Sequence, residues 1–443
     1  MHMARLRPLL ATVLLLLSAP GLLAAQNSQL PSGSASASAS ARPLLQYSLP
    51  PDKLAQAYAL YLLDGALYFV TAVWGFLVLW MMLRNRFGQR LGDLAQRVSR
   101  YRIVQAVIVM SLFVVAFELT QLPCALYGHH IGLKYGLSVQ HWASWFGDWG
   151  KSLLLGCIFA SGLGRILYRM LRLSPRRWWF YFWLAVIPIV VFVAFITPIW
   201  IEPMFNKFEP LSDHHSDLVA QIERVVQRAG MDIPPQRTFE MKASEKHTTL
   251  NAYVTGFGAT KRVVVWDTTM QQMTTPETLF VFGHEMGHYV LGHVLKEAAI
   301  DLLLLLVLFY VAYRLANWLV ARHGARWGIR DLSDWASLPL LVLILSVIAF
   351  LATPAFNAVS RYYEHQADQY GLEVIHGLVP DESRTAAQAF QKLGELSLDY
   401  PYVNRFWELW AWTHPTIRDR MIFVQSYDPW AEGKQPEFVK NVP

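Results

Sequence analysis

The sequence has few charged residues for its length. Asp, Glu, Lys and Arg make up 16% of the 443 residues, whereas a soluble domain has about 25%. Hydrophobic residues make up 54%. These proportions exclude a disordered chain, a collagen and a coiled coil, and they argue against an ordinary soluble enzyme. They predict several membrane-spanning helices together with one soluble domain of modest size.

Cysteine is almost absent. Cys124 and Cys157 both lie in apolar stretches, and two cysteines are too few for a disulfide framework or a thiolate zinc site. The net charge is +6, but the basic residues lie in short bursts between apolar runs. This distribution favours Arg-rich loops beside a membrane, so we expect lipid contact and no nucleic-acid partner.

The N-terminal 25 residues have the pattern of a secretory signal. Arg5 and Arg7 precede the apolar run 9–17, and small residues follow at 24–25. We predict a signal peptide over 1–25 that is cleaved, with an uncleaved signal anchor as the alternative. Residues 26–58, which include a Ser/Ala-rich stretch, are predicted to be a flexible linker.

Six further apolar runs reach the about 20 residues that a helix needs to cross a bilayer. They lie near 62–83, 103–125, 152–171, 178–200, 298–320 and 336–358. They predict N-terminal transmembrane helices over 59–200 and two more over 298–358. Two polar regions remain, 201–297 and 359–443. The first has patterns typical of strands at 238–242, 251–256 and 262–266, and of a helix that starts at Pro276 and continues into the fifth apolar run.

Bursts of arginine predict the orientation. The loops 84–102, 172–177 and 322–330 contain six, three and three arginines. All three loops lie on the same side in a six-span layout, and the positive-inside rule places that side in the cytoplasm. Both polar regions would then face the periplasm of a bacterium.

The strongest chemical signal is the sequence His284-Glu285-Met286-Gly287-His288. Histidines at i and i+4 share one helix face, so both imidazoles can bind one Zn²⁺, and Glu285 can act as the general base. A catalytic zinc needs a third protein ligand and an open position. His293 lies about 180° from His284 on a continuous helix, so we expect it to be a surface or interfacial residue.

A third ligand is expected in the second polar region. Glu364 and Asp368 share a helix face, so one carboxylate could bind the metal while the other accepts the N–H of a ligand histidine. The same spacing fits equally well an acidic helix face that is exposed to solvent and binds no metal. His365 is a competing ligand, but it points about 100° away from Glu364.

The chain resembles the CAAX prenyl protease 1 family of polytopic membrane zinc metalloproteases. The resemblance runs from about residue 60 to about 425. Its motifs occur in one order: LTQLP at 119–123, YGLS at 135–138, PMFNKF at 203–208, NAY at 251–253, KRVV at 261–264, HEMGH at 284–288, LGH at 291–293, SRYYEHQAD at 360–368 and HP at 414–415.

The resemblance implies a role for each site residue. Glu364 would complete a site of two histidines and one glutamate for one Zn²⁺ per chain, and Asp368 would orient a ligand histidine. Asn251 would lie on an exposed edge strand that pairs with the substrate backbone. His414 would steady the oxyanion and Arg420 would support that segment near the substrate. From the residues alone, Asn251 fits a turn and His414 the end of a helix.

The predicted fold is therefore mainly α: a polytopic helical membrane protein with six to seven spans and a small α+β zincin-like metalloprotease domain. Residues 201–297 would hold the HExxH helix and 359–443 the third ligand. We expect a zinc endopeptidase of the inner membrane that acts on peptides or proteins. The alternatives are a transporter or scaffold with a structural zinc, or a general quality-control protease. Eukaryotic relatives in this family would place the site in the cytosol instead.

Overall fold

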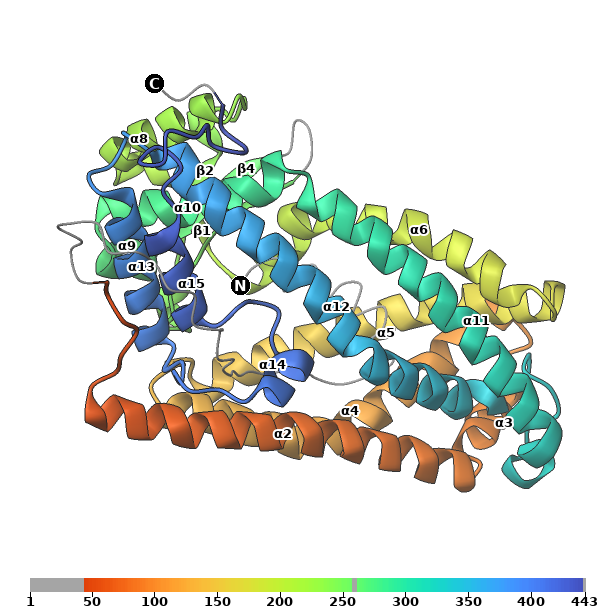
Figure 1. The fold of residues 1–443 in the computed structure, drawn as a ribbon. Coiled ribbons are helices and arrows are strands. Elements are labelled where there is room, and N and C mark those ends of the chain that lie inside the picture. The colour runs from red at the N-terminus through yellow and green to blue at the C-terminus, as the bar shows by residue number, and fades with distance from the viewer. Residues whose placement is uncertain (1–43, 257–260, 441–443) are drawn as a thin grey trace.

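The computed structural model describes residues 44–256 and 261–440. The predicted signal peptide and the Ser/Ala-rich part of the predicted linker lie outside these residues. Figure 1 shows long helices that run side by side, with a small sheet and shorter helices gathered at one end.

Five of the described helical segments are long and apolar enough to cross a membrane. They are α2 (Pro51–Arg84), α4 (Arg102–Lys134), α5 (Trp142–Leu173), α6 (Trp178–Ile196) with its continuation to Phe205, and the segment Trp335–Ile375 that contains α12 (Leu338–Ile375). The apolar run 298–320 lies in α11 (His293–Trp327), which packs against α6 and α12 but is not among the five. The fold class is confirmed as a mainly helical polytopic membrane protein, with five such spans in the described part where six to seven were predicted.

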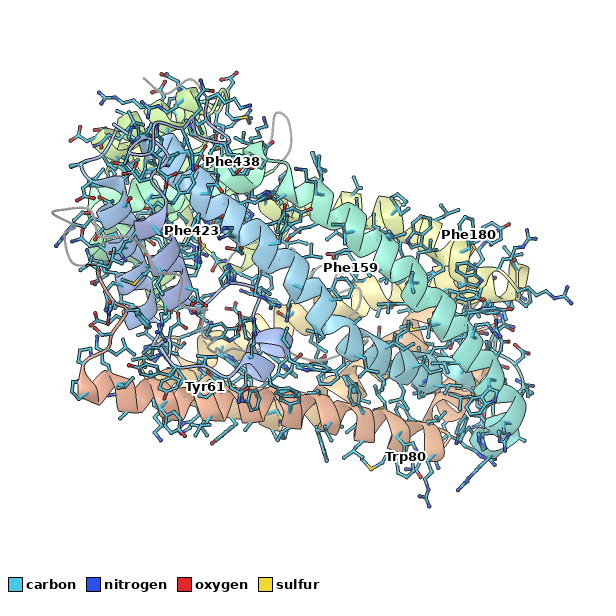
Figure 2. The ribbon with its side chains drawn as sticks, in the orientation of Figure 1. Tyr61, Trp80, Phe159, Phe180, Phe423 and Phe438 are labelled. Atoms are coloured by element: carbon cyan, nitrogen blue, oxygen red, sulfur yellow. The ribbon has the colours of Figure 1, made fainter. Side chains whose placement is uncertain are left out.

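The outer surface of these helices is apolar. Trp80 and Phe180 are 44% and 37% exposed. Figure 2 shows both residues at the end of the helices that lies away from the sheet. Exposed aromatic rings of this kind are typical of side chains that face lipid near the membrane–water interface.

The structure places part of the predicted linker in ordered contact. α2 begins at Pro51, so residues 51–58 are helical, and Tyr47 is buried. The Tyr47 hydroxyl donates to the carbonyl of Asp399 at 2.6 Å, and the Leu45 amide donates to Gln425 at 2.7 Å. Apolar residues follow the Ser/Ala stretch here, and they dock against the C-terminal helices. The prediction of a flexible linker is therefore wrong for residues 44–58.

A four-stranded sheet forms in the polar region between α6 and α11. Its strands are β1 (Phe208–Pro210), β2 (Thr238–Met241), β3 (Ala252–Thr255) and β4 (Arg262–Trp266), in the order β1-β2-β4-β3. β2 and β4 are parallel and the other pairs are antiparallel. All three predicted strands are present, and β3 lies at one edge of the sheet.

Both polar regions contribute to one core around this sheet. The helices α8 (Ser216–Arg228) and α10 (Thr275–Val290) come from the first region, and α13 (Glu382–Leu396) and α15 (Ile417–Ser426) from the second. α12 carries 38 residues and runs from the membrane bundle into this core. It therefore brings the second polar region against α10.

A glycine allows α10 and α12 to approach closely. A Cβ atom at Gly371 would lie 3.0 Å from the backbone nitrogen of His284. Since that separation is shorter than an ordinary van der Waals contact, a larger residue would force the helices apart. The HExxH helix and the C-terminal part of α12 therefore lie nearly in backbone contact.

A buried carboxylate fixes the C-terminal segment to α12. Glu373 is fully buried and accepts hydrogen bonds from the backbone amides of Glu437, Phe438 and Val439 at 3.0, 2.7 and 2.8 Å. Hydrogen bonds to an ionised carboxylate are stronger than those between neutral groups. This contact holds the end of the described chain against the helix that carries Glu364 and Asp368.

Candidate metal centre

The HExxH motif lies on a helix with a well-defined start. α10 begins at Thr275, one residue before the start at Pro276 that the sequence predicts. Thr274 caps the helix, and the Glu277 carboxylate accepts from the Thr274 backbone amide at 2.6 Å. Pro276 occupies the first turn, where its missing N–H costs nothing. Helical spacing then places His284 and His288 on one face, and both are buried.

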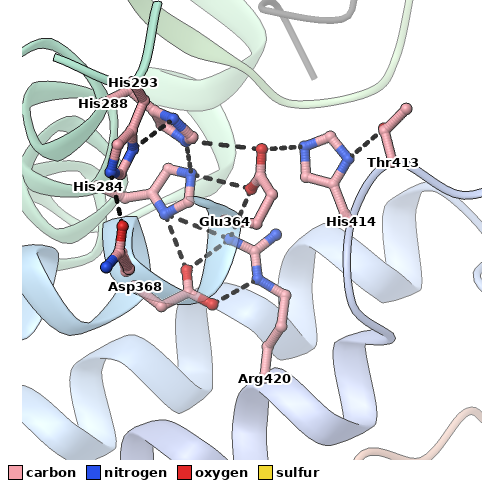
Figure 3. A network of polar contacts seen from close by, with 9 residues as sticks. His284, His288, His293, Glu364, Asp368, Thr413, His414 and Arg420 are labelled. Carbon is pink, nitrogen blue, oxygen red and sulfur yellow. Dashed lines mark hydrogen bonds and ion pairs between the residues drawn. The ribbon is translucent and has the colours of Figure 1, made fainter. Parts of the chain in front are cut away.

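The structure brings three candidate ligands together, as Figure 3 shows. The Nε2 atoms of His284 and His288 are 3.2 Å apart. The Glu364 oxygens lie 3.3 Å from Nε2 of His284 and 3.5 Å from Nε2 of His288. One ligand atom from each residue lies within 4.8 Å of the other two. Two imidazoles and a carboxylate are a donor set that catalytic zinc sites use.

The contacts of both histidines fit neutral imidazoles that carry the proton on Nδ1. Nδ1 of His284 lies 2.8 Å from Asp368, a carboxylate that can only accept, so this nitrogen carries the proton. Nδ1 of His288 lies 3.3 Å from Nδ1 of His293, whose Nε2 lies 3.1 Å from the Oε1 atom of Gln366. If His293 donates to Gln366, its Nδ1 accepts from His288.

In these tautomers the Nε2 atoms of His284 and His288 each carry a lone pair and no proton. The two atoms face one another at 3.2 Å. The buried Oε2 atom of Glu364 has no hydrogen-bond partner within the described residues. Such a group costs free energy unless a partner is supplied. A divalent cation would satisfy all three atoms, so the residues fit the metal that the motif predicts.

The position of His293 differs from the prediction. It is fully buried rather than a surface residue, and it contacts His288. The reason is that the helix does not continue: α10 ends at Val290, Gly292 has φ +68°, and α11 begins at His293. Glycine adopts this left-handed conformation readily. Because the break resets the helical phase, the angle expected from a continuous helix does not apply, and burial lowers the pKa of His293 to about 4.

Asp368 and Arg420 form a buried pair behind His284. The Arg420 guanidinium donates through Nη2 to Oδ1 at 2.6 Å and through Nε to Oδ2 at 2.8 Å. A two-point bond of this kind holds the carboxylate in a fixed orientation. Asp368 therefore lies where it can orient His284. The geometry of Arg420 is that of a residue that supports Asp368.

His414 lies on the other side of Glu364. Its Nε2 is 3.1 Å from the Oε1 atom of Glu364, and its Nδ1 is 2.7 Å from the Thr413 hydroxyl. Burial lowers the pKa of His414 to about 4. The imidazole thus lies at the edge of the candidate metal centre.

Glu285 and Asn251 complete the predicted set. Glu285 is 8% exposed, and burial raises the pKa of its carboxyl group. Asn251 directly precedes the edge strand β3 and is 6% exposed, so it is less open than predicted. The backbone amide of Asn251 donates to the Thr269 hydroxyl at 2.7 Å. This bond ties the start of β3 to α9 (Asp267–Gln272).

Two residues that the sequence prediction missed hold the segment before His414. Asn357 donates to the carbonyl of Trp410 at 2.9 Å, and Arg361 donates to the carbonyl of Trp412 at 2.6 Å. Both acceptors lie at the end of α14 (Arg405–Ala411). The available signal was spacing: 357, 361, 364 and 368 are separated by four, three and four residues, which places them on one helix face.

Replacing Arg361 by methionine is expected to lower kcat for a peptide substrate by about tenfold. Loss of an oxyanion donor costs about 10²–10³, and here His414, for which that role is predicted, would only be loosened. KM and metal content should stay unchanged. Arg361→Lys keeps one donor and should recover part of the loss, whereas Arg405→Lys, an exposed change on α14, should have no effect. Equal kcat values for Arg361→Met and the unaltered chain would contradict this role.

Comparisons with known proteins agree with this geometry. Residues 212–428 match the model of peptidase family M48, and residues 38–207 match the CAAX prenyl protease N-terminal model of five membrane helices. The chain is 33% identical to the uncharacterized metalloprotease YhfN of Bacillus subtilis, over 84% of this chain and 85% of that one. It is 27% identical to CAAX prenyl protease 1 of Saccharomyces cerevisiae, over 72% of each.

A solved structure has the same fold. The Ste24p crystal structure from S. mikatae aligns with a TM-score of 0.71 at 20% identity, covering 84% of this chain and 88% of that one. The matches favour the protease over a transporter or scaffold with a structural metal. The chain belongs to peptidase family M48 and is an integral membrane metalloendopeptidase.

Proposed function

We propose that the chain binds one Zn²⁺ through His284, His288 and Glu364 and hydrolyses peptide bonds beside it. The observation that carries the proposal is the convergence of the three ligand atoms within 4.8 Å. The Asp368–Arg420 pair would hold His284 in the tautomer that leaves Nε2 free. The ion, when bound, would supply Lewis-acid activation of water and of the scissile carbonyl.

The residues of the chain would carry the protons. Glu285 is next to a ligand histidine on α10, and it would take a proton from the attacking water and pass it to the leaving amine. His414 would donate a hydrogen bond to the oxyanion as negative charge develops. The edge strand β3, which begins next to Asn251, would pair with the extended substrate backbone.

The fold and the relatives support a proposal for the substrate class. The centre lies at one end of a helical bundle that spans a membrane, so a substrate tethered to lipid could reach it. The matched yeast relative is named CAAX prenyl protease 1, and we infer that the substrates are CAAX-type peptides or membrane proteins in general. The domain boundaries at 25, 200, 297 and 358 belong to the same proposal.

The orientation rests on the arginine loops. α3 (Phe87–Val98) lies in the loop 84–102, and Figure 1 shows it at the opposite end of the helices from β2 and β4. By the positive-inside rule that end is cytoplasmic. The metal centre would then face the periplasm of a bacterial inner membrane, in contrast to a cytosolic site.

The test compares protein N-termini from membranes that contain the unaltered chain with N-termini from membranes that contain His288→Ala. New N-termini that appear only with the unaltered chain would identify substrates and the side of the membrane on which they are cut. Identical sets of N-termini, with both proteins present in equal amounts, would overturn the proposed activity.

A further inference from the structure

Four arginines gather at the end of the bundle away from the metal centre. Arg165, Arg169 and Arg172 follow one another at intervals of four and three residues in the last turns of α5, so they share one face of that helix. α4 packs against α5, with Met110 beside Gly164. Arg102 begins α4 eight residues before that contact, and Arg172 lies eight residues after it, so an antiparallel pair places them together. We name these four residues the arginine face.

The arginine face lacks balancing negative charge. The main charged neighbours of Arg172 are Arg102, Arg165 and Arg169, all of the same sign. Residues 149–201 contain no Asp or Glu. Among the described residues none of the four forms an ion pair, and the nearby Asp334 is bound to Arg330 at 2.8 Å. Like charges held together in this way repel one another unless an anion lies between them.

Two guanidinium nitrogens of the arginine face are also buried. The Nε atom of Arg165 and the Nη1 atom of Arg172 have no hydrogen-bond partner within the described part of the chain. Burying an N–H of a charged group without an acceptor is costly. Both the charge and the missing acceptors therefore point to an anionic ligand with several oxygen atoms, and a phosphate has this chemistry.

The surroundings of the arginine face are apolar. Ile158 and Leu173 on α5 are 57% and 67% exposed, and Ile103 on α4 is 64% exposed. Phe180 at the start of α6 also points outward in Figure 2. These side chains belong to spanning helices, so they would lie beside acyl chains. A free phosphate would leave this apolar surface unused, whereas a phospholipid would cover it.

We propose that the arginine face is a binding site for the phosphate group of an anionic phospholipid, whose acyl chains lie along α4 and α5. Basic groups between helices at the cytoplasmic end of a membrane protein attract anionic headgroups, with about 1 kcal/mol for each Lys or Arg near the surface. That energy corresponds to about a fivefold change in affinity for each arginine.

The test measures lipid binding to the full chain in detergent by native mass spectrometry. Titration with phosphatidylglycerol and with phosphatidylcholine should show that phosphatidylglycerol is retained at a concentration at least about 25-fold lower than phosphatidylcholine. The double substitution Arg165→Gln, Arg172→Gln should weaken phosphatidylglycerol binding by about 25-fold and leave phosphatidylcholine binding unchanged. Equal binding of the two lipids by the unaltered chain would overturn the proposal.

Matched variants separate the site from general charge effects. Arg90→Gln with Arg97→Gln removes the same charge from exposed positions on α3 and should reduce binding far less. Arg169→Gln alone changes an exposed residue, so it keeps the test decisive if the double variant does not fold. A third titration with inorganic phosphate should not displace the lipid. Displacement at micromolar phosphate would show that the site holds a free anion, which contradicts the proposal.

Discussion

Replacing Glu285 by glutamine is expected to lower kcat for peptide hydrolysis by about three orders of magnitude, because general acid–base groups contribute about 10²–10⁴. The amide has the same shape as the carboxylate but cannot take a proton from water. The three candidate ligands are untouched, so metal content should remain at that of the unaltered chain. The measurement is turnover of a casein-type or peptide substrate together with metal analysis of the same sample.

The Glu285 variant needs a control that removes a carboxylate elsewhere. Glu432 is exposed and pairs with Lys434 near the C-terminus, at 2.6 Å, so Glu432→Gln should keep full activity. Full turnover by Glu285→Gln would mean that another group acts as the base. Loss of metal together with activity would instead show that Glu285 supports the ligands.

The HExxH half of the site could be predicted because it is local. Two histidines four residues apart share a helix face whatever surrounds them, and the structure brings both Nε2 atoms to within 3.2 Å. The start of α10, at Thr275, differs by one position from the start predicted at Pro276. Helical periodicity also paired Glu364 with Asp368, but it left open which carboxylate faces the metal.

The other half depends on contacts between distant parts of the chain. Which carboxylate meets the histidines is set by the close approach of α10 and α12 at Gly371, and periodicity gives no information on such an approach. The place of His293 depends on a positive φ at Gly292, which interrupts a run that otherwise looks helical. The glycine was the only local sign of that break.

The membrane part was predicted from composition with similar limits. Long apolar runs located the helices well, because a bilayer fixes their length. The Ser/Ala stretch suggested a flexible linker, yet the residues from 44 onward dock onto C-terminal segments that lie hundreds of positions later in the sequence, as the Tyr47–Asp399 hydrogen bond shows. Such docking depends on a partner surface that is remote in sequence.

Replacing Glu364 by glutamine is expected to lower metal affinity by more than about 100-fold. Loss of a residue that only orients a ligand costs about 10–100-fold, and here the charged group that faces both histidines is itself removed. The metal content of the purified protein should fall toward zero, with hydrolysis lost in parallel. Adding Zn²⁺ should no longer raise the unfolding temperature, because a ligand stabilises the folded state only when its concentration exceeds Kd.

Glu373 provides the matched control on the same helix. It is also a buried glutamate, but it lies about 13 Å further along α12 and binds backbone amides of the C-terminal segment. Glu373→Gln should lower the unfolding temperature and still bind metal. If Glu364→Gln kept its metal while Glu373→Gln lost it, the C-terminal contact would control metal binding. The proposed ligand set would then be wrong, because a carboxylate remote from the histidines would matter more than the one between them.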